Sequence, residues 1–80
     1  MEKEFIFLRL VKGTKKDGSV YMFLDYLNPI TLEPLKYWYN DKPIDFANLQ
    51  KKLVKGSELK KFVGICGVDD KDHVYIKDVR

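Results

Sequence analysis

Asp45-Phe-Ala-Asn-Leu-Gln-Lys-Lys-Leu-Val-Lys-Gly56 is the segment of the chain whose apolar residues repeat at the spacing of an α-helix. Phe46, Leu49 and Leu53 fall at positions i, i+3 and i+7, and therefore form one apolar stripe along a helix. The spacing predicts a helix over residues 46–55 that packs this stripe against the rest of the fold.

Both ends of the predicted helix carry signals of their own. Asp45 is a typical N-cap, and Ile44 and Leu49 have the spacing of a hydrophobic staple. Gly56 is a typical C-terminal stop. The lysines between residues 51 and 61 are expected to lie on a solvated surface.

Strands are expected on both sides of the helix, because the flanking segments are rich in aromatic and β-branched residues and are separated by turn signals such as Asp17-Gly18. Three strands precede the helix and two follow it: residues 4–12, 20–27, 35–40, 61–68 and 73–79. The element order is β-β-β-α-β-β. The sequence thus predicts one mainly β domain with one helix, spanning residues 1–80.

Alternation within the strands separates an aliphatic set from a set of rings and cations. The aliphatic set is expected to form the core: Ile6, Leu8, Leu10, Val20, Met22, Leu24, Leu49, Leu53, Val74 and Ile76. The opposite faces carry Phe5, Phe7, Arg9, Tyr21, Phe23, Lys36 and Trp38. Core or interface positions are an alternative for Phe5, Phe7 and Phe23, and a slip of one residue in the third strand would present Tyr37 and Tyr39 instead.

Composition limits the classes of function. The chain has 80 residues, a net charge of +3, and five Tyr, five Phe and one Trp, which are many rings for so small a core. The lone Cys66 excludes an internal disulfide and is expected to be buried in a reducing compartment. Because no apolar run approaches the roughly 20 residues of a membrane span and no signal-peptide pattern is present, we expect a cytoplasmic protein without a membrane partner.

Catalytic and metal-binding patterns are not recognisable. Cys66 and His73 are the only thiol and imidazole, and their spacing does not indicate a nucleophile–base pair. Asp69, Asp70 and Asp72 lack the glycine and the distal glutamate of a calcium loop, so a solvated turn is expected there. We therefore expect neither an enzyme, nor a cofactor, nor a metal site.

The basic hairpin Lys12-Gly-Thr-Lys-Lys-Asp-Gly-Ser-Val-Tyr21, together with the element order, resembles the small OB-fold single-stranded-DNA-binding proteins of phages and mobile elements. The resemblance spans nearly the whole chain at the level of topology. It implies a five-stranded antiparallel OB-like barrel whose helix closes one end.

The rings and cations lead to a binding hypothesis. Bases stack on flat rings while cations hold the phosphates, so the chain is expected to bind single-stranded nucleic acid, DNA first, with little sequence specificity. The expected stacking residues are Tyr21, Phe23 and Trp38, and the expected phosphate contacts are Arg9, Lys15, Lys16 and Lys36. A homodimer or higher oligomer would lengthen the short footprint of one barrel. The alternatives are a protein-interaction or homo-oligomeric accessory module that uses the same aromatic face and, last, a small-ligand carrier.

Overall fold

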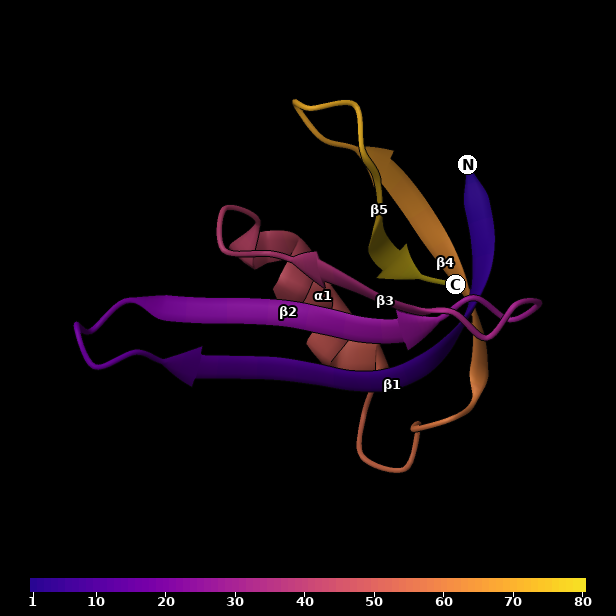
Figure 1. Cartoon of the computed structure of the whole chain (residues 1–80), viewed down its shortest axis with the longest axis horizontal. Helices are drawn as coiled ribbons and strands as arrows, with labels where there is room; N and C mark the ends of the chain where they lie inside the picture. Colours follow the sequence, from indigo (N-terminus) through magenta and orange to yellow (C-terminus); the bar gives the residue numbers. More distant parts are fainter.

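Five strands and one helix form in the order that the sequence predicts. The structure is a computed structural model that describes residues 1–80. Its elements are β1 (Glu2–Thr14), β2 (Val20–Leu27), β3 (Pro34–Trp38), α1 (Pro43–Lys52), β4 (Lys61–Val68) and β5 (Val74–Val79) (Figure 1).

The strands form one antiparallel sheet in the order β3-β2-β1-β4-β5. The long β1 lies at its centre, where residues 2–6 pair with β4 and residues 6–14 pair with β2. β3 and β5 are the two edges, and no backbone ladder joins them. The mainly β fold with one helix is therefore confirmed, whereas the sheet is not closed and a barrel is not confirmed.

A β-bulge in β1 changes which residues face the core. Phe7 pairs with Tyr26 and Arg9 with Asp25, so Leu8 is an extra residue without a partner. Before the bulge, the odd-numbered Phe5 and Phe7 point inward and are buried, whereas Ile6 and Leu8 are only half-buried. The prediction that Phe5 and Phe7 share the outward face with Arg9, and that Ile6 and Leu8 lie in the core, is wrong, because regular alternation does not hold across a bulge. The alternative that gave the two phenylalanines core positions is confirmed.

After the bulge, Leu10 packs against the core. Of the predicted core, Met22, Leu24, Leu49, Leu53 and Ile76 are buried together, as expected. Val20 and Val74 are exposed, because each is the first residue of its strand and follows a turn. The core also contains Phe5, Phe7, Tyr26, Tyr39, Phe46, Tyr75 and Val79. Cys66 is buried and free, as its apolar surroundings predict.

The helix begins at Pro43, one turn earlier than predicted, and ends at Lys52. Proline is well suited to the first helical position, since its φ is preset and its missing N–H is not needed there. Lys42 is the N-cap and makes no side-chain cap hydrogen bond, so the prediction that Asp45 caps the helix is wrong. Ile44 is exposed and makes no staple. Gly56 lies beyond the helix in a turn, where its φ is +96°.

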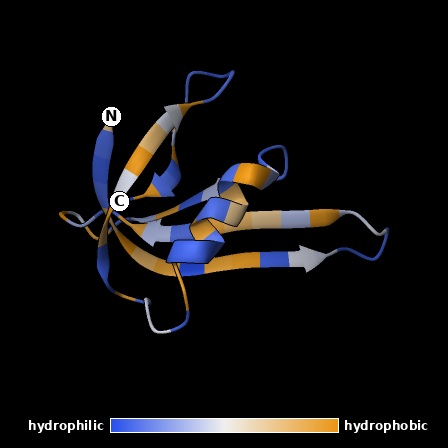
Figure 2. Cartoon of the chain, turned by 180° about the vertical axis from the view of Figure 1, so that it is seen from behind, coloured by the Kyte–Doolittle hydropathy of each residue, from blue (hydrophilic) through white to orange (hydrophobic).

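α1 lies across the inner face of the sheet and packs mainly against β5 (Figure 2). Phe46 and Leu49 are buried in this contact and Leu53 follows at its end, so the predicted stripe is confirmed. Lys52 is not simply solvated, because its Nζ lies 2.8 Å from the carbonyl oxygen of Val79 and 3.0 Å from the carboxylate of Asp78. The helix is thus tied to β5 by apolar and polar contacts.

No helix of this structure has the length and apolar character that crossing a membrane requires.

Replacing Leu49, which is fully buried, should show how much the helix contact contributes. Leu49→Ala is expected to lower the free energy of unfolding by about 2–5 kcal/mol, because the lost side chain leaves a cavity. Lys51→Ala, an exposed position on the same helix, should change it by less than about 0.5 kcal/mol. Urea denaturation measures both values, and similar losses for the two variants would contradict the assignment of the buried stripe.

Candidate functional site

The face of β1, β2 and β3 that points away from α1 gathers rings and charges. Strand register aligns them in rows: Arg9, Asp25 and Lys36 lie side by side, and Val11, Phe23 and Trp38 form the next row. We call this surface the outer face and define it by Arg9, Val11, Tyr21, Phe23, Asp25, Lys36 and Trp38. The structure thus brings together five of the seven predicted site residues, from three strands.

Phe23 lies beneath the other side chains of the outer face. Only 7% of it is exposed. The Arg9 guanidinium lies 5.3 Å and the Lys36 ammonium 4.3 Å from the centre of its ring, and the Trp38 ring lies 4.9 Å away. The prediction that Phe23 is an exposed stacking ring is therefore wrong. Its ring is the apolar support that two cations and the indole of Trp38 contact.

Asp25 fixes the same two cations from the side. Its carboxylate accepts a hydrogen bond from Arg9 Nε at 2.6 Å and lies 3.9 Å from Lys36 Nζ. The side chain of Asp25 is 15% exposed, whereas that of Arg9 is 63% exposed. Because Arg9 uses only Nε in this contact, its two terminal nitrogens remain as donors toward solvent. The row of Arg9, Asp25 and Lys36 therefore has a net charge of about +1, because one carboxylate balances only one of the two cations.

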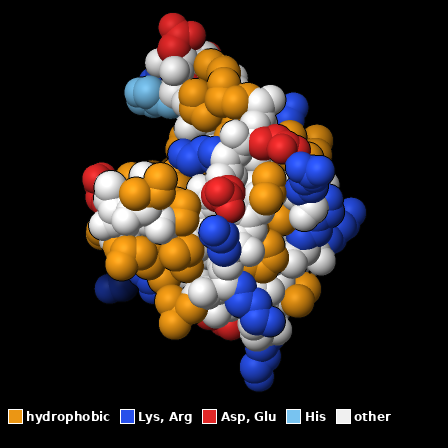
Figure 3. Space-filling view, turned by 90° about the vertical axis from the view of Figure 1, so that its right-hand side faces the viewer, with side chains coloured by type: hydrophobic (Ala, Val, Ile, Leu, Met, Phe, Trp, Pro, Cys, Tyr) orange, Lys and Arg blue, Asp and Glu red, His pale blue; other side chains and the backbone are white.

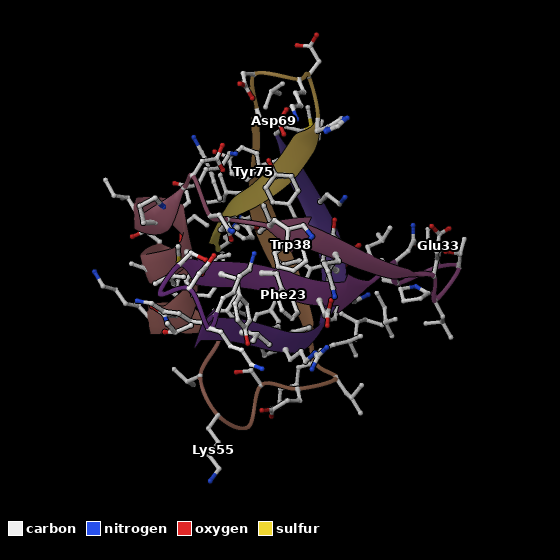
Figure 4. All side chains as sticks on the ribbon, turned by 60° about the vertical axis from the view of Figure 1, so that its left-hand side comes forward. Phe23, Glu33, Trp38, Lys55, Asp69 and Tyr75 are labelled. Carbon is white, nitrogen blue, oxygen red and sulfur yellow. The ribbon has the colours of Figure 1, made fainter.

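Trp38 is the most exposed ring of the outer face, with half of its surface accessible. Figure 4 shows it above Phe23, on the side of the molecule that also bears Tyr75. Tyr21 stacks on the other side of Phe23, with ring centres 6.4 Å apart and planes 15° apart. Its ring covers Gly13, where an added Cβ would lie 2.4 Å from the ring, so Gly13 permits this close approach.

Lys15 and Lys16 lie at the tip of the β1–β2 hairpin, exposed and beyond the outer face (Figure 1). Asp17 organises this tip, because its carboxylate accepts hydrogen bonds from the amide of Ser19 at 2.9 Å and from its hydroxyl at 2.6 Å. Gly18 has a φ of +88°, which turn residues of this kind require. The side chains of the two lysines make no hydrogen bond, ion pair or cation–π contact, and they form a separate positive arm beyond the outer face.

A pocket of about 300 Å³ adjoins the outer face at Trp38. β3, the loop before α1 and the β4–β5 turn enclose it, and Figure 3 shows the acidic and histidine side chains of the upper lobe standing apart from the body above a hollow. We call it the β3–turn pocket, and its lining is Lys36, Tyr37, Trp38, Asp41, Lys42, Asp69, Asp70, Lys71 and His73. The sequence predicted Lys36 and Trp38 as site residues among these, and offered Tyr37 as an alternative in a shifted register.

Aromatic contacts beside this pocket link the two edge strands. Tyr37 of β3 stacks on Tyr75 of β5 with ring centres 5.1 Å apart and planes 8° apart. The Lys42 ammonium lies 5.4 Å from the first ring and 5.1 Å from the second. Tyr39 adds a hydrogen bond from its hydroxyl to the carbonyl oxygen of Ile76. Side chains, not backbone pairs, thus connect the edges of the sheet.

Asp70 and Asp72 are exposed in the β4–β5 turn, as the sequence predicts, but the prediction of a solvated side chain is wrong for Asp69, which is only 8% exposed. Its carboxylate accepts hydrogen bonds from the Tyr37 hydroxyl at 2.7 Å and from the amides of Lys71 and His73 at 2.9 and 2.8 Å. These donors, the hydroxyl first, lower the pKa of Asp69 to about 2. Asp69 therefore fixes the turn and joins it to β3.

Tyr75 is held in its neutral form by its neighbours. Its hydroxyl donates to Asp45 at 2.7 Å, and this hydrogen bond together with burial raises the pKa of Tyr75 to about 12. The carboxylate of Asp45 thus accepts a hydrogen bond from a tyrosine of β5, and not from the backbone amides at the start of the helix, as the sequence predicts for a cap.

Comparison with protein-family models, with curated proteins and with solved structures finds no match for this chain. No three His, Cys, Asp or Glu side chains are grouped so that they could hold a metal ion. The outer face and the β3–turn pocket beside it are the features of the molecule that bear on its function.

The lowered pKa of Asp69 gives a test of the turn. A carboxyl whose folded pKa lies below its unfolded value of about 3.9 stabilises the fold above pH 4, and this contribution is lost as pH falls toward 2. Asp69→Asn should therefore be less stable than the wild type at pH 7, with a difference that shrinks between pH 4 and pH 2. Thermal unfolding over this range measures it, with Asp72→Asn in the same turn as control. A gap that is constant with pH would contradict the assignment.

Proposed function

We propose that the chain binds single-stranded nucleic acid on the outer face. The observation that supports this most is the half-exposed Trp38 beside Arg9 and Lys36, two cations that Phe23 and Asp25 hold in place. A ring on which a base can stack, next to cations that can contact its phosphates, is the combination that single-strand binding requires.

The fixed position of these cations favours binding. A mobile lysine or arginine loses rotamer freedom when it contacts a phosphate, at a cost of about 0.5–1.5 kcal/mol per side chain. Arg9 and Lys36 lose less, because contacts with Phe23 and Asp25 already restrict them. Arg9 retains two terminal nitrogens that match two oxygens of a phosphate.

The topology supports the same proposal and the OB-like barrel that we infer with it. β1 lies between β2 and β4, the helix lies between β3 and β4 in sequence, and rings connect β3 to β5. OB folds are partly open five-stranded barrels that bind oligonucleotides on strands 2 and 3 and on the loops between strands 1–2 and 4–5. In this chain those places carry Phe23, Trp38, Lys15 and Lys16, and the lining of the β3–turn pocket.

A second candidate is a protein-interaction or oligomerisation module. Ile30 and Leu32 in the β2–β3 turn are 90% and 58% exposed, although exposing aliphatic side chains gives up hydrophobic stabilisation. Salt separates the two candidates, since affinity for a polyanion falls steeply with ionic strength and an apolar contact hardly responds.

Trp38 provides the direct test, since it is the only tryptophan. A base stacked on the indole should quench its fluorescence, and Trp38→Ala should weaken binding of a single-stranded oligonucleotide by about 1–3 kcal/mol without changing the salt slope. Tryptophan fluorescence of the wild-type protein measures the quenching, and anisotropy of a labelled oligonucleotide at low and high salt measures the affinity and the salt slope of Trp38→Ala. Saturating oligonucleotide that leaves the emission unchanged would remove Trp38 from the site, and absence of any binding would favour the interaction module.

The hairpin lysines are expected to act through charge alone. Lys15→Ala and Lys16→Ala should each reduce the magnitude of the slope of log affinity against log salt by about 0.7, the value for one phosphate contact on a single strand. Lys51→Ala, on the helix at the opposite face, is the matched control and should leave the slope unchanged. Equal slopes for all three variants would show that the hairpin does not contact the strand.

A further inference from the structure

The β3–turn pocket differs in charge from the outer face. Three lysines and three aspartates line it, whereas the outer face and the hairpin tip carry a surplus of positive charge. A phosphate in the pocket would lie near as many carboxylates as ammonium groups and would gain little electrostatic energy. If a strand binds as proposed, its backbone is drawn toward Arg9 and the hairpin, and the pocket is left for an uncharged part of the nucleotide, the base.

Two carboxylates of the pocket keep free hydrogen-bond acceptors. Asp70 is exposed and takes part in none of the side-chain hydrogen bonds or ion pairs of the structure. Asp41, whose side chain is 73% exposed, contacts Lys42 through Oδ1 at 3.0 Å and leaves Oδ2 free. Asp69 differs from both, because the Tyr37 hydroxyl and two backbone amides already occupy its oxygens.

Most cations of the pocket are already engaged. The ammonium of Lys36 lies over the rings of the outer face and near Asp25, and that of Lys42 lies over two tyrosine rings and near Asp41. The side chain of Lys71 makes no such contact and keeps its donors free. The free groups of the pocket are therefore the carboxylate oxygens of Asp70 and Asp41, the ammonium of Lys71 and the exposed imidazole of His73, of which only Nδ1 lies near Asp69.

We propose that a base stacked on Trp38 turns its hydrogen-bonding edge into the β3–turn pocket, and that the pocket prefers guanine to thymine. Guanine presents N1–H and N2–H₂ as adjacent donors that match the two oxygens of a carboxylate, and its O6 accepts from an ammonium group. Thymine presents a single N3–H between two carbonyl oxygens, which carboxylates repel. Adenine and cytosine offer one amino group each and rank between them. This preference rests on the proposed function and adds selectivity at one position to binding that is otherwise tolerant of sequence.

The first experiment compares two labelled oligonucleotides, one of thymidine alone and one with a single central guanosine, by fluorescence anisotropy with the wild-type protein. The guanosine oligonucleotide should bind roughly tenfold more tightly, the order of discrimination of one good bidentate contact. The ratio should not change with salt, because both strands carry the same number of phosphates. Deoxyinosine at the central position lacks the N2 amino group and should lose most of the preference.

Variants then assign the preference to the pocket. Asp70→Asn and Asp41→Asn, singly and together, should bring the ratio toward one, while binding of both oligonucleotides strengthens slightly because negative charge is removed. Asp72→Asn makes the same charge change in the same turn outside the pocket lining, and asparagine tolerates its φ of +62°. This control should keep the full ratio.

The outcomes separate the two proposals. Equal binding of both oligonucleotides by the wild type overturns the base preference and leaves single-strand binding in place. A ratio that survives the double substitution of Asp41 and Asp70 overturns its assignment to this pocket. Absence of binding to either oligonucleotide overturns the proposed function and the base preference with it.

Discussion

The β-bulge at Leu8 is the constraint on which the two faces of the sheet depend. β1 must place Phe5, which pairs with β4, and Phe7, which pairs with β2, in the core before the bulge, and Leu10 in the core after it. Strict alternation cannot satisfy both requirements, because positions 7 and 10 would point to opposite sides of a regular strand. One extra residue resolves the conflict and turns Arg9 outward. Without it the guanidinium would face the apolar core, where an unpaired charge is strongly unfavourable.

A second constraint acts at the edges of the sheet. β3 and β5 approach each other but share no backbone hydrogen bonds, so the stacked rings of Tyr37 and Tyr75 and the hydroxyl of Tyr39 hold them together. The turn carrying Asp69 is attached to β3 in the same way. The shape of the β3–turn pocket therefore depends on a few tyrosine side chains, whereas the outer face rests on continuous strand pairing.

This difference explains what the sequence could predict. Regular alternation in β2 and β3 was enough to place Tyr21, Phe23, Lys36 and Trp38 on one face, and the helical spacing of Phe46, Leu49 and Leu53 was enough to find the buried stripe. Arg9 lies on the outer face as predicted, but only because of the bulge, since the same alternation placed Phe5 and Phe7 wrongly on that face. A bulge has no reliable signal in a single sequence, since any residue of β1 could have been the extra one.

The parts that the sequence missed depend on contacts between distant segments. The partners of Asp69 and Asp45 are tyrosines more than twenty-five residues away, so local turn and capping rules assigned these carboxylates to solvent and to the helix end. The burial of Phe23 likewise follows from side chains on two neighbouring strands. Only the start of the helix had an overlooked local signal, since Pro43 is a common first helical residue.

The side-chain link between β3 and β5 has a kinetic consequence. Separating the two edges moves buried rings apart and breaks the hydrogen bond of Tyr39, but it breaks no rung of the backbone ladder, so we expect this seam to open before the paired strand boundaries of the sheet. The β4–β5 turn beside the seam is a loop, and loop movements take place in nanoseconds to microseconds, far faster than local unfolding of a paired strand. The β3–turn pocket lies beside this seam, so we expect its width to vary more readily than that of the outer face, which rests on paired strands.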